Sequence, residues 1–124
     1  MSKISIRFYK DWEVRAIWND SDGKWYFSAL DLVGGINGQA DYQKNRNYWK
    51  YLKSKLKRVK PEVVSATNQL KLLAPDGKRR LTDVLDQEQV AIVAAAFPNN
   101  KAADFLNWFT YSDNTIDGQS RKKA

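Results

Sequence analysis

The sequence predicts an α+β fold, a small antiparallel sheet of hairpins packed with about four helices. Segments that alternate apolar and polar residues occur next to one another, and two Asp-Gly pairs suited to tight turns stand between such segments. Segments with helical spacing do not alternate with the strands as βαβ units would. The 124 residues are the size of one ordinary domain, and a hydrophobic content of 43% is enough for a core.

The first third of the chain predicts three strands and a short helix. The period of two in ISIRFY and again in VRAIW indicates two strands, and Asp22-Gly23 favours a hairpin turn into a third, KWYFS. Ser28 and Asp31 have the spacing of a helix cap. We expect Gly34-Gly35 to end that helix after barely two turns.

The rest of the chain predicts the other elements in order. A basic helix runs from about Tyr42 to Val59, and Pro61 follows it. The run NQLKLLAPDGKRRLTDV indicates two strands around a turn at Asp76-Gly77. Asp86 and Gln89 form a capping box before a helix. That helix and a last one, from about Asn100, place on their apolar stripes Val90, Val93, Ala94, Phe97, Ala102, Phe105, Leu106 and Phe109.

The chain divides into a domain and a polar tail. Residues 1–111 contain all of the predicted strands and helices, whereas residues 112–124 are polar and end in charges. We therefore expect the tail to begin a linker to a further C-terminal region. No apolar run approaches the roughly 20 residues of a membrane span, and no signal peptide is evident, so we expect a cytoplasmic protein.

Two residue types are absent, and their absence excludes much chemistry. The chain has no cysteine and no histidine, so disulfides, thiolate nucleophiles, Cys/His zinc sites and Ser-His-Asp triads are excluded. We expect no enzymatic activity and no cofactor. Asp83, Asp86 and Glu88 are close in sequence, but helix capping accounts for them better than a metal site does.

The net charge of +7 comes from one segment. Residues 43–60 hold eight Lys or Arg and no Asp or Glu, while the rest of the chain carries a net charge of −1. On a helix, Tyr48, Leu52, Leu56 and Val59 share a stripe that we expect to face the core. A second stripe is uniformly cationic and consists of Arg46, Lys50, Lys53, Lys57 and Lys60.

The uniform charge of this second stripe favours an anionic partner. Ordinary surface helices mix signs, because like-charge neighbours cost roughly 0.2–0.5 kcal/mol each. Contacts with nucleic-acid phosphates would offset this cost, although a solvated face and an acidic protein or lipid surface remain alternatives. The predicted nucleic-acid-binding residues are Lys44, Asn45, Arg46, Trp49, Lys50, Lys53, Lys57 and Lys60, with Asn45, Arg46 and Asn47 as candidates for base contacts and Trp49 as a partly exposed neighbour. A possible secondary contact consists of Lys78, Arg79 and Arg80.

Five segments of the chain have the order and spacing of a known family, namely EVRAIW, WYFSALDLVG, NYWKYLKSKLK, QLKLLAPDGKRRLTDV and FPNNKAADFLNWF. Together they resemble the BRO N-terminal domain family, in the branch of DNA-damage-inducible protein D and prophage antirepressor-like proteins. The resemblance implies an α+β domain associated with DNA binding, or one that acts on a repressor protein, and it brings no catalytic residues. Gly34-Gly35 departs from the family pattern, in which larger residues prolong the first helix.

Two functions follow as expectations. The first is a DNA-binding domain of a prophage or mobile-element regulator, or of a DNA-damage-response protein, that contacts the phosphate backbone through the basic helix. The second is a protein-interaction module that docks on an acidic partner such as a repressor or a recombination protein.

Overall fold

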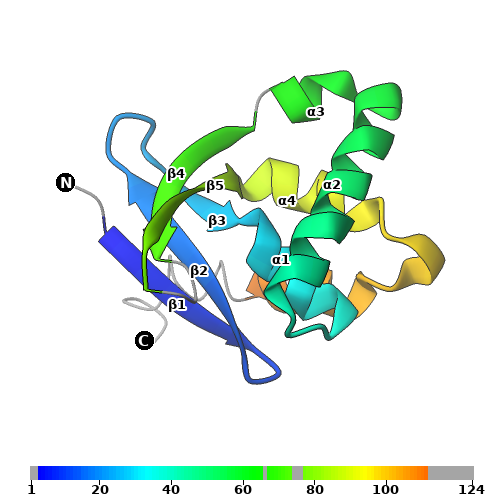
Figure 1. Cartoon of the computed structure of the whole chain (residues 1–124), viewed down its shortest axis with the longest axis horizontal. Helices are drawn as coiled ribbons and strands as arrows, with labels where there is room; N and C mark the ends of the chain where they lie inside the picture. Colours follow the sequence, from blue (N-terminus) through cyan, green and yellow to red (C-terminus); the bar gives the residue numbers. More distant parts are fainter. Residues whose placement is uncertain (1–2, 66, 74–76, 112–124) are drawn as a thin grey trace.

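The strands form one antiparallel sheet in the part of the chain that the structure describes. The computed structural model describes residues 3–65, 67–73 and 77–111 (Figure 1). The five strands are β1 (Lys3–Tyr9), β2 (Trp12–Asn19), β3 (Lys24–Ser28), β4 (Asn68–Leu73) and β5 (Arg79–Leu85), in the order β1-β2-β3-β5-β4. The predicted α+β class with hairpins is confirmed. The boundary near residue 111 is not tested, because residues 112–124 lie outside the described ranges.

Five helices pack beside the sheet within the same described ranges. They are α1 (Ala29–Asn37), α2 (Tyr42–Val59), α3 (Pro61–Ser65), α4 (Gln87–Ala95) and a last helix over 103–111, preceded by the 3-10 turn Pro98–Asn100. In Figure 1 the strands lie to the left and the helices to the right, with the long α2 on the near side. None of these helices is long and apolar enough to cross a membrane.

Tight turns connect the strands. The β1–β2 turn places Lys10 and Asp11 at φ of 49° and 68°, which is the left-handed backbone that a two-residue hairpin requires. In the predicted β2–β3 turn, the Gly23 amide donates to the Asn19 carbonyl at 2.8 Å, and Gly23 has a φ of 65°. Of the second predicted turn, Asp76 lies outside the described residues, and Gly77 has a φ of 86°.

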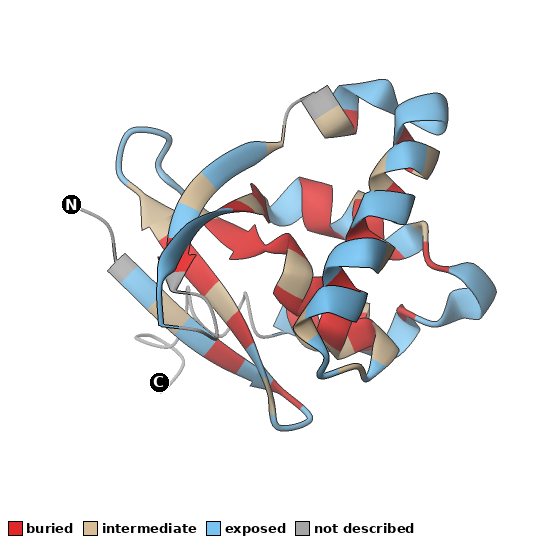
Figure 2. Cartoon of the chain, viewed as in Figure 1, coloured by how far each residue is buried: buried red, intermediate tan, exposed pale blue. Residues whose placement is uncertain are grey.

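Strand β1 buries the face that looks more polar in sequence. Arg7 and Tyr9 are 6% and 8% exposed, whereas Ile4, Ile6 and Phe8 are 59%, 48% and 59% exposed (Figure 2). The Arg7 guanidinium lies 4.8 Å from the centroid of the Phe27 ring, and the Tyr9 ring packs on Phe105. Aromatic rings from other elements therefore determine which face of β1 is buried. Such rings pack favourably against the guanidinium of Arg7 and the ring of Tyr9 as well as against aliphatic side chains.

Helix α1 is longer than the sequence predicts. Ser28 caps it as expected, accepting from the Asp31 amide at 3.2 Å, but the helix continues through Gly34-Gly35 and ends at Gly38, which has a φ of 62°. The two glycines serve packing instead. The Trp12 indole lies against them and donates to the Asp31 carbonyl at 2.8 Å, so a side chain at Gly34 would collide with it and one at Gly35 would be tightly packed against it.

Gly34→Ala is expected to destabilise the fold by about 1–2 kcal/mol, because overpacking outweighs the helix propensity gained. A Cβ at residue 34 would collide with Trp12 Cζ2 and would lie 2.8 Å from Asn45 Nδ2. Gly35→Ala is the matched control, since its nearest contact would be 3.1 Å, and it should cost less. Urea unfolding measures both, and a Gly34→Ala variant as stable as wild type would contradict this packing.

The last two helices complete the core as the sequence predicts. Asp86 and Gln89 form both hydrogen bonds of the capping box at the start of α4. The predicted apolar stripes are buried, with Leu106 only partly so; the fully buried members are Val90, Val93, Ala94, Phe97, Ala102, Phe105 and Phe109. A second, smaller cluster between the strands consists of Ile17, Tyr26, Leu72 and Val84. The sheet and these helices thus form the support on which α2 lies.

Candidate nucleic-acid interface

Helix α2 has the predicted bounds but is rotated about its axis relative to the predicted core stripe. The Asp41 carboxylate caps it by accepting from the Lys44 amide at 3.0 Å. Leu52 and Leu56 of the predicted core stripe are buried, as expected. The other buried residues of the helix are Asn45 and Trp49, in place of Tyr48 and Val59. Val59 is 66% exposed and Tyr48 is only partly buried. The buried stripe thus begins at the polar Asn45, which hydropathy cannot identify as buried.

Trp49 is buried, so the prediction of a partly exposed ring beside the cations is wrong. It is 5% exposed, and its Nε1 donates to Asp83 Oδ2 at 2.7 Å. The ring belongs to the main core, and a hydrogen-bond partner for the indole is supplied by β5, 34 residues away. Trp49 therefore packs beneath the exposed residues of the cleft, and its ring is not available to stack on a base.

Asn45 is also unavailable to a ligand. It is 4% exposed, and its Nδ2 donates to the Gln39 carbonyl at 2.9 Å, which ties α2 to the loop after α1. Its burial and this hydrogen bond argue against the predicted contact of Asn45 with nucleic acid. Burial against Gly34 explains it, because the side chain fills the space that the glycine leaves.

Lys53 is committed to an internal ion pair. Its Nζ lies 2.9 Å from Asp83 Oδ2, and its side chain is 36% exposed while that of Asp83 is 11% exposed. Gln69 Nε2 donates to the other carboxylate oxygen at 2.9 Å. Burial acts to raise the pKa of Asp83, but the hydrogen bonds from Trp49, Gln69 and Lys53 and the charge of Lys53 outweigh it and lower this pKa. Asp83 thus stays ionised and neutralises Lys53.

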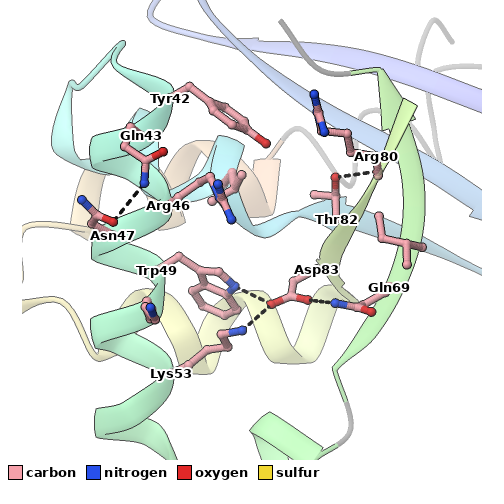
Figure 3. Close-up of a pocket in the computed structure, with 13 residues that line it drawn as sticks. Tyr42, Gln43, Arg46, Asn47, Trp49, Lys53, Gln69, Arg80, Thr82 and Asp83 are labelled. Atoms are coloured by element: carbon pink, nitrogen blue, oxygen red, sulfur yellow. Dashed lines mark hydrogen bonds and ion pairs between the residues drawn. The ribbon is translucent and has the colours of Figure 1, made fainter. Parts of the chain in front are cut away.

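A cleft of about 770 Å³ lies between α2 and the β4–β5 hairpin (Figure 3). It is lined from the helix by Tyr42, Gln43, Arg46, Asn47, Trp49, Lys50 and Lys53, from the hairpin by Gln69, Arg80, Leu81, Thr82 and Asp83, and by Leu30 of α1. The cleft brings Arg80, from the predicted secondary contact, onto the same surface as Arg46 and Lys50. Figure 3 shows Arg46 on the helix side and Arg80 on the strand side.

The other predicted cations lie outside the cleft. Lys44 and Lys57 are exposed on α2, and Lys60 is exposed directly after its last residue. Lys78 and Arg79 are exposed where β5 begins, and none of these five residues lines the cleft. In Figure 2 much of the surface of α2 on the near side is exposed. Because these five cations do not line the cleft, they would not contact a small anion bound there. A long anionic ligand that passes through the cleft could reach them along either element.

The lining of the cleft is cationic with a polar rim. Its side chains carry the positive charges of Arg46, Lys50, Lys53 and Arg80 and the negative charge of Asp83, a net charge of +3. Within the described ranges, Arg46 and Lys50 form no ion pair with a carboxylate. The arrangement can therefore hold an anion between helix and hairpin, with Asp83 already neutralised by Lys53.

The cleft includes residues that the sequence did not identify as binding candidates, among them Gln43 and Gln69. Helical spacing could have found Gln43, because residues 43, 46, 47 and 50 fall at i, i+3, i+4 and i+7. No sequence signal could have found Gln69, since it depends on the register of β4 against β5 that pairs Gln69 with Asp83.

The acidic residues near the cleft have structural partners. Asp83 accepts from Trp49, Lys53 and Gln69, and Asp86 caps α4 and pairs with Lys24 at 3.2 Å. Among the described residues there is no group of three or more acidic, His or Cys side chains that could hold a metal ion.

Comparison of the chain with protein-family models, with curated proteins and with solved structures gives no significant match. The resemblance to the BRO N-terminal domain family therefore stays a prediction, and the cleft is the structural feature that bears on function.

Proposed function

We propose that this is a non-enzymatic DNA-binding domain that holds the phosphate backbone in the cleft between α2 and the β4–β5 hairpin. The observation that supports it most is the convergence of Arg46, Lys50 and Arg80 on one cleft. Arg80 lies 34 positions from Arg46 and 30 positions from Lys50 in the chain. Among the described residues that line the cleft, Asp83 carries the single carboxylate, and Lys53 neutralises it. We place the protein in the cytoplasm, as part of a prophage or mobile-element regulator or a DNA-damage-response protein.

The energetics of α2 support an anionic partner. Arg46 and Lys50 are like-charge neighbours at i, i+4, and Lys50, Lys53 and Lys57 continue the row, at a cost of roughly 0.2–0.5 kcal/mol for each pair. The internal pair with Asp83 relieves only Lys53. Phosphates in the cleft would offset the repulsion between Arg46 and Lys50. Arginine suits this role because its planar fork forms two hydrogen bonds with one phosphate.

Salt dependence tests the proposal. Binding of a labelled random duplex, followed by fluorescence anisotropy from about 50 to 300 mM salt, is expected to weaken with a log–log slope of roughly −3 to −5, as three to five phosphate contacts require. A slope near zero, or no binding at about 50 mM salt, would show that the cleft does not take up phosphates.

A second candidate is a protein-interaction module that docks on an acidic partner such as a repressor or a recombination protein. The specific observation in its favour is that Tyr51 and Val59 on α2 are 54% and 66% exposed beside the cations. Tyrosine is enriched in protein interfaces, and phosphates gain little from either side chain. This candidate would be favoured if the domain captures an acidic protein from a nuclease-treated lysate and the domain itself has no affinity for duplex DNA.

A further inference from the structure

An exposed pair of amide side chains lies on α2 beside the cations of the cleft. Gln43 and Asn47 are both exposed, and Gln43 Nε2 donates to Asn47 Oδ1 at 3.1 Å (Figure 3). Together with Arg46 and Lys50 they occupy one face of the first half of the helix. Glutamine, asparagine and arginine are the residues that most often contact base edges in the major groove.

The cleft lacks the feature that single-strand sites use. Such sites stack successive bases on exposed aromatic rings. Of the aromatic rings that line this cleft, Trp49 is buried and Tyr42 is half-buried with the Arg46 guanidinium 5.9 Å from its ring centroid. Because neither ring is open for stacking, the ligand that suits the cleft is a duplex.

Helix α2 has the dimensions for a duplex groove. Its 18 residues span about 27 Å, and a helix of about 10–12 Å diameter fits the major groove. Recognition helices contact base edges with their N-terminal residues, and Gln43 and Asn47 lie in the first two turns of α2. The backbone of one DNA strand would then run along the cleft, between Lys50 and Arg80.

The hydrogen bond within the amide pair leaves Gln43 able to read one base. The Gln43 amide has a second N–H, and its Oε1 has no hydrogen-bond partner among the described residues; these two groups match N7 and N6–H₂ of adenine. Asn47 uses its Oδ1 to accept from Gln43 and so fixes the plane of the glutamine amide. Fixing the amide in advance reduces the conformational entropy lost on binding.

We infer that α2 reads duplex DNA from the major groove, with Gln43 recognising adenine and Asn47 acting as its positioning residue. The inference rests on the proposed function, and it adds sequence preference and strandedness to it. Neither phosphate contacts nor net charge would produce such a preference, because they carry no sequence information.

Enrichment from a randomised duplex pool tests the inference. Wild type is expected to enrich a site in which one position prefers adenine by about tenfold or more. Gln43→Ala should lose the preference at that position. Gln43→Glu should shift the position toward cytosine, because a carboxylate accepts from N4–H₂ of cytosine but cannot donate to adenine N7. Asn47→Ala should weaken the preference at the same position only.

Gln87→Glu is the matched control, because Gln87 is exposed at the start of α4 and lies outside the cleft. It should leave the base preference unchanged. Wild type that binds random duplex without enriching a sequence, or that binds a single strand more tightly, would overturn the inference and leave the proposed function standing. Gln43 variants that keep the adenine preference would also overturn it. Failure to bind any duplex or single strand would instead remove the proposed function itself.

Discussion

Arg46→Glu combined with Lys50→Glu is expected to weaken binding to a random duplex by about 100-fold or more at about 100 mM salt. Two phosphate contacts are lost and two repulsive charges enter the cleft, so the slope of log affinity against log salt should also become shallower by about 2. Both side chains are exposed, and neither forms an ion pair with a described carboxylate, so the fold should persist. Anisotropy titrations at several salt concentrations measure both effects.

Lys10→Glu combined with Lys101→Glu is the matched control, since it changes the net charge by the same amount outside the cleft. Both residues are exposed, and the contact of Lys10 with Asp104, 3.7 Å between side chains that are 70% and 77% exposed, contributes little to stability. Equal weakening by the two double variants would show that net charge acts alone. Unchanged affinity of the Arg46/Lys50 variant would refute the cleft as the binding surface.

Asp83→Ala is expected to destabilise the domain by about 2–3 kcal/mol, because it leaves a buried indole N–H and a half-buried ammonium without their acceptor. The three donors are Trp49 Nε1 at 2.7 Å, Lys53 Nζ at 2.9 Å and Gln69 Nε2 at 2.9 Å. Thermal unfolding followed by circular dichroism should show a melting temperature lower by several degrees. Asp104→Ala, which removes an exposed carboxylate, is the control and should change stability little.

The loss of stability caused by Asp83→Ala should become smaller at acidic pH. The pKa of Asp83 is lower in the folded protein than its ordinary value, so its ionised form stabilises the fold. This contribution is complete above the unfolded pKa, about 3.9, and disappears as the pH falls through the lower folded pKa. The difference in unfolding free energy between wild type and variant should therefore shrink only below about pH 4. A difference that is constant down to pH 2 would contradict the assigned network.

The same variant should keep its affinity for DNA below its melting temperature. Removing Asp83 releases Lys53 and adds one net positive charge to the cleft, so binding to random duplex should be equal to or tighter than that of wild type. A large loss of affinity in the folded variant would mean that Asp83 itself contacts the ligand. Asp83→Ala should therefore lower the stability of the domain without lowering its affinity for DNA. This combination would show that Asp83 stabilises the cleft but does not contact the ligand.

Much of the chain could be predicted from local sequence. The bounds of α2, the Asp86–Gln89 capping box and the Asp22-Gly23 turn are each specified by residues within a few positions of one another. Alternation and helical spacing found all five strands and most of the helices, since these periods are properties of the backbone. The absence of cysteine and histidine and the placement of eight cations in 18 residues are likewise fixed by the sequence alone.

The remaining features depend on which elements meet, and only the tertiary structure decided them. Trp49 is buried because β5 supplies Asp83 as its acceptor, and helix α1 continues past Gly34 because the Trp12 ring from β2 needs that space. Arg80 joins the basic helix only through the packing of the β4–β5 hairpin beside α2. Each depends on a contact between segments far apart in the chain, and local patterns do not encode such contacts because the same helix or strand can bury either face.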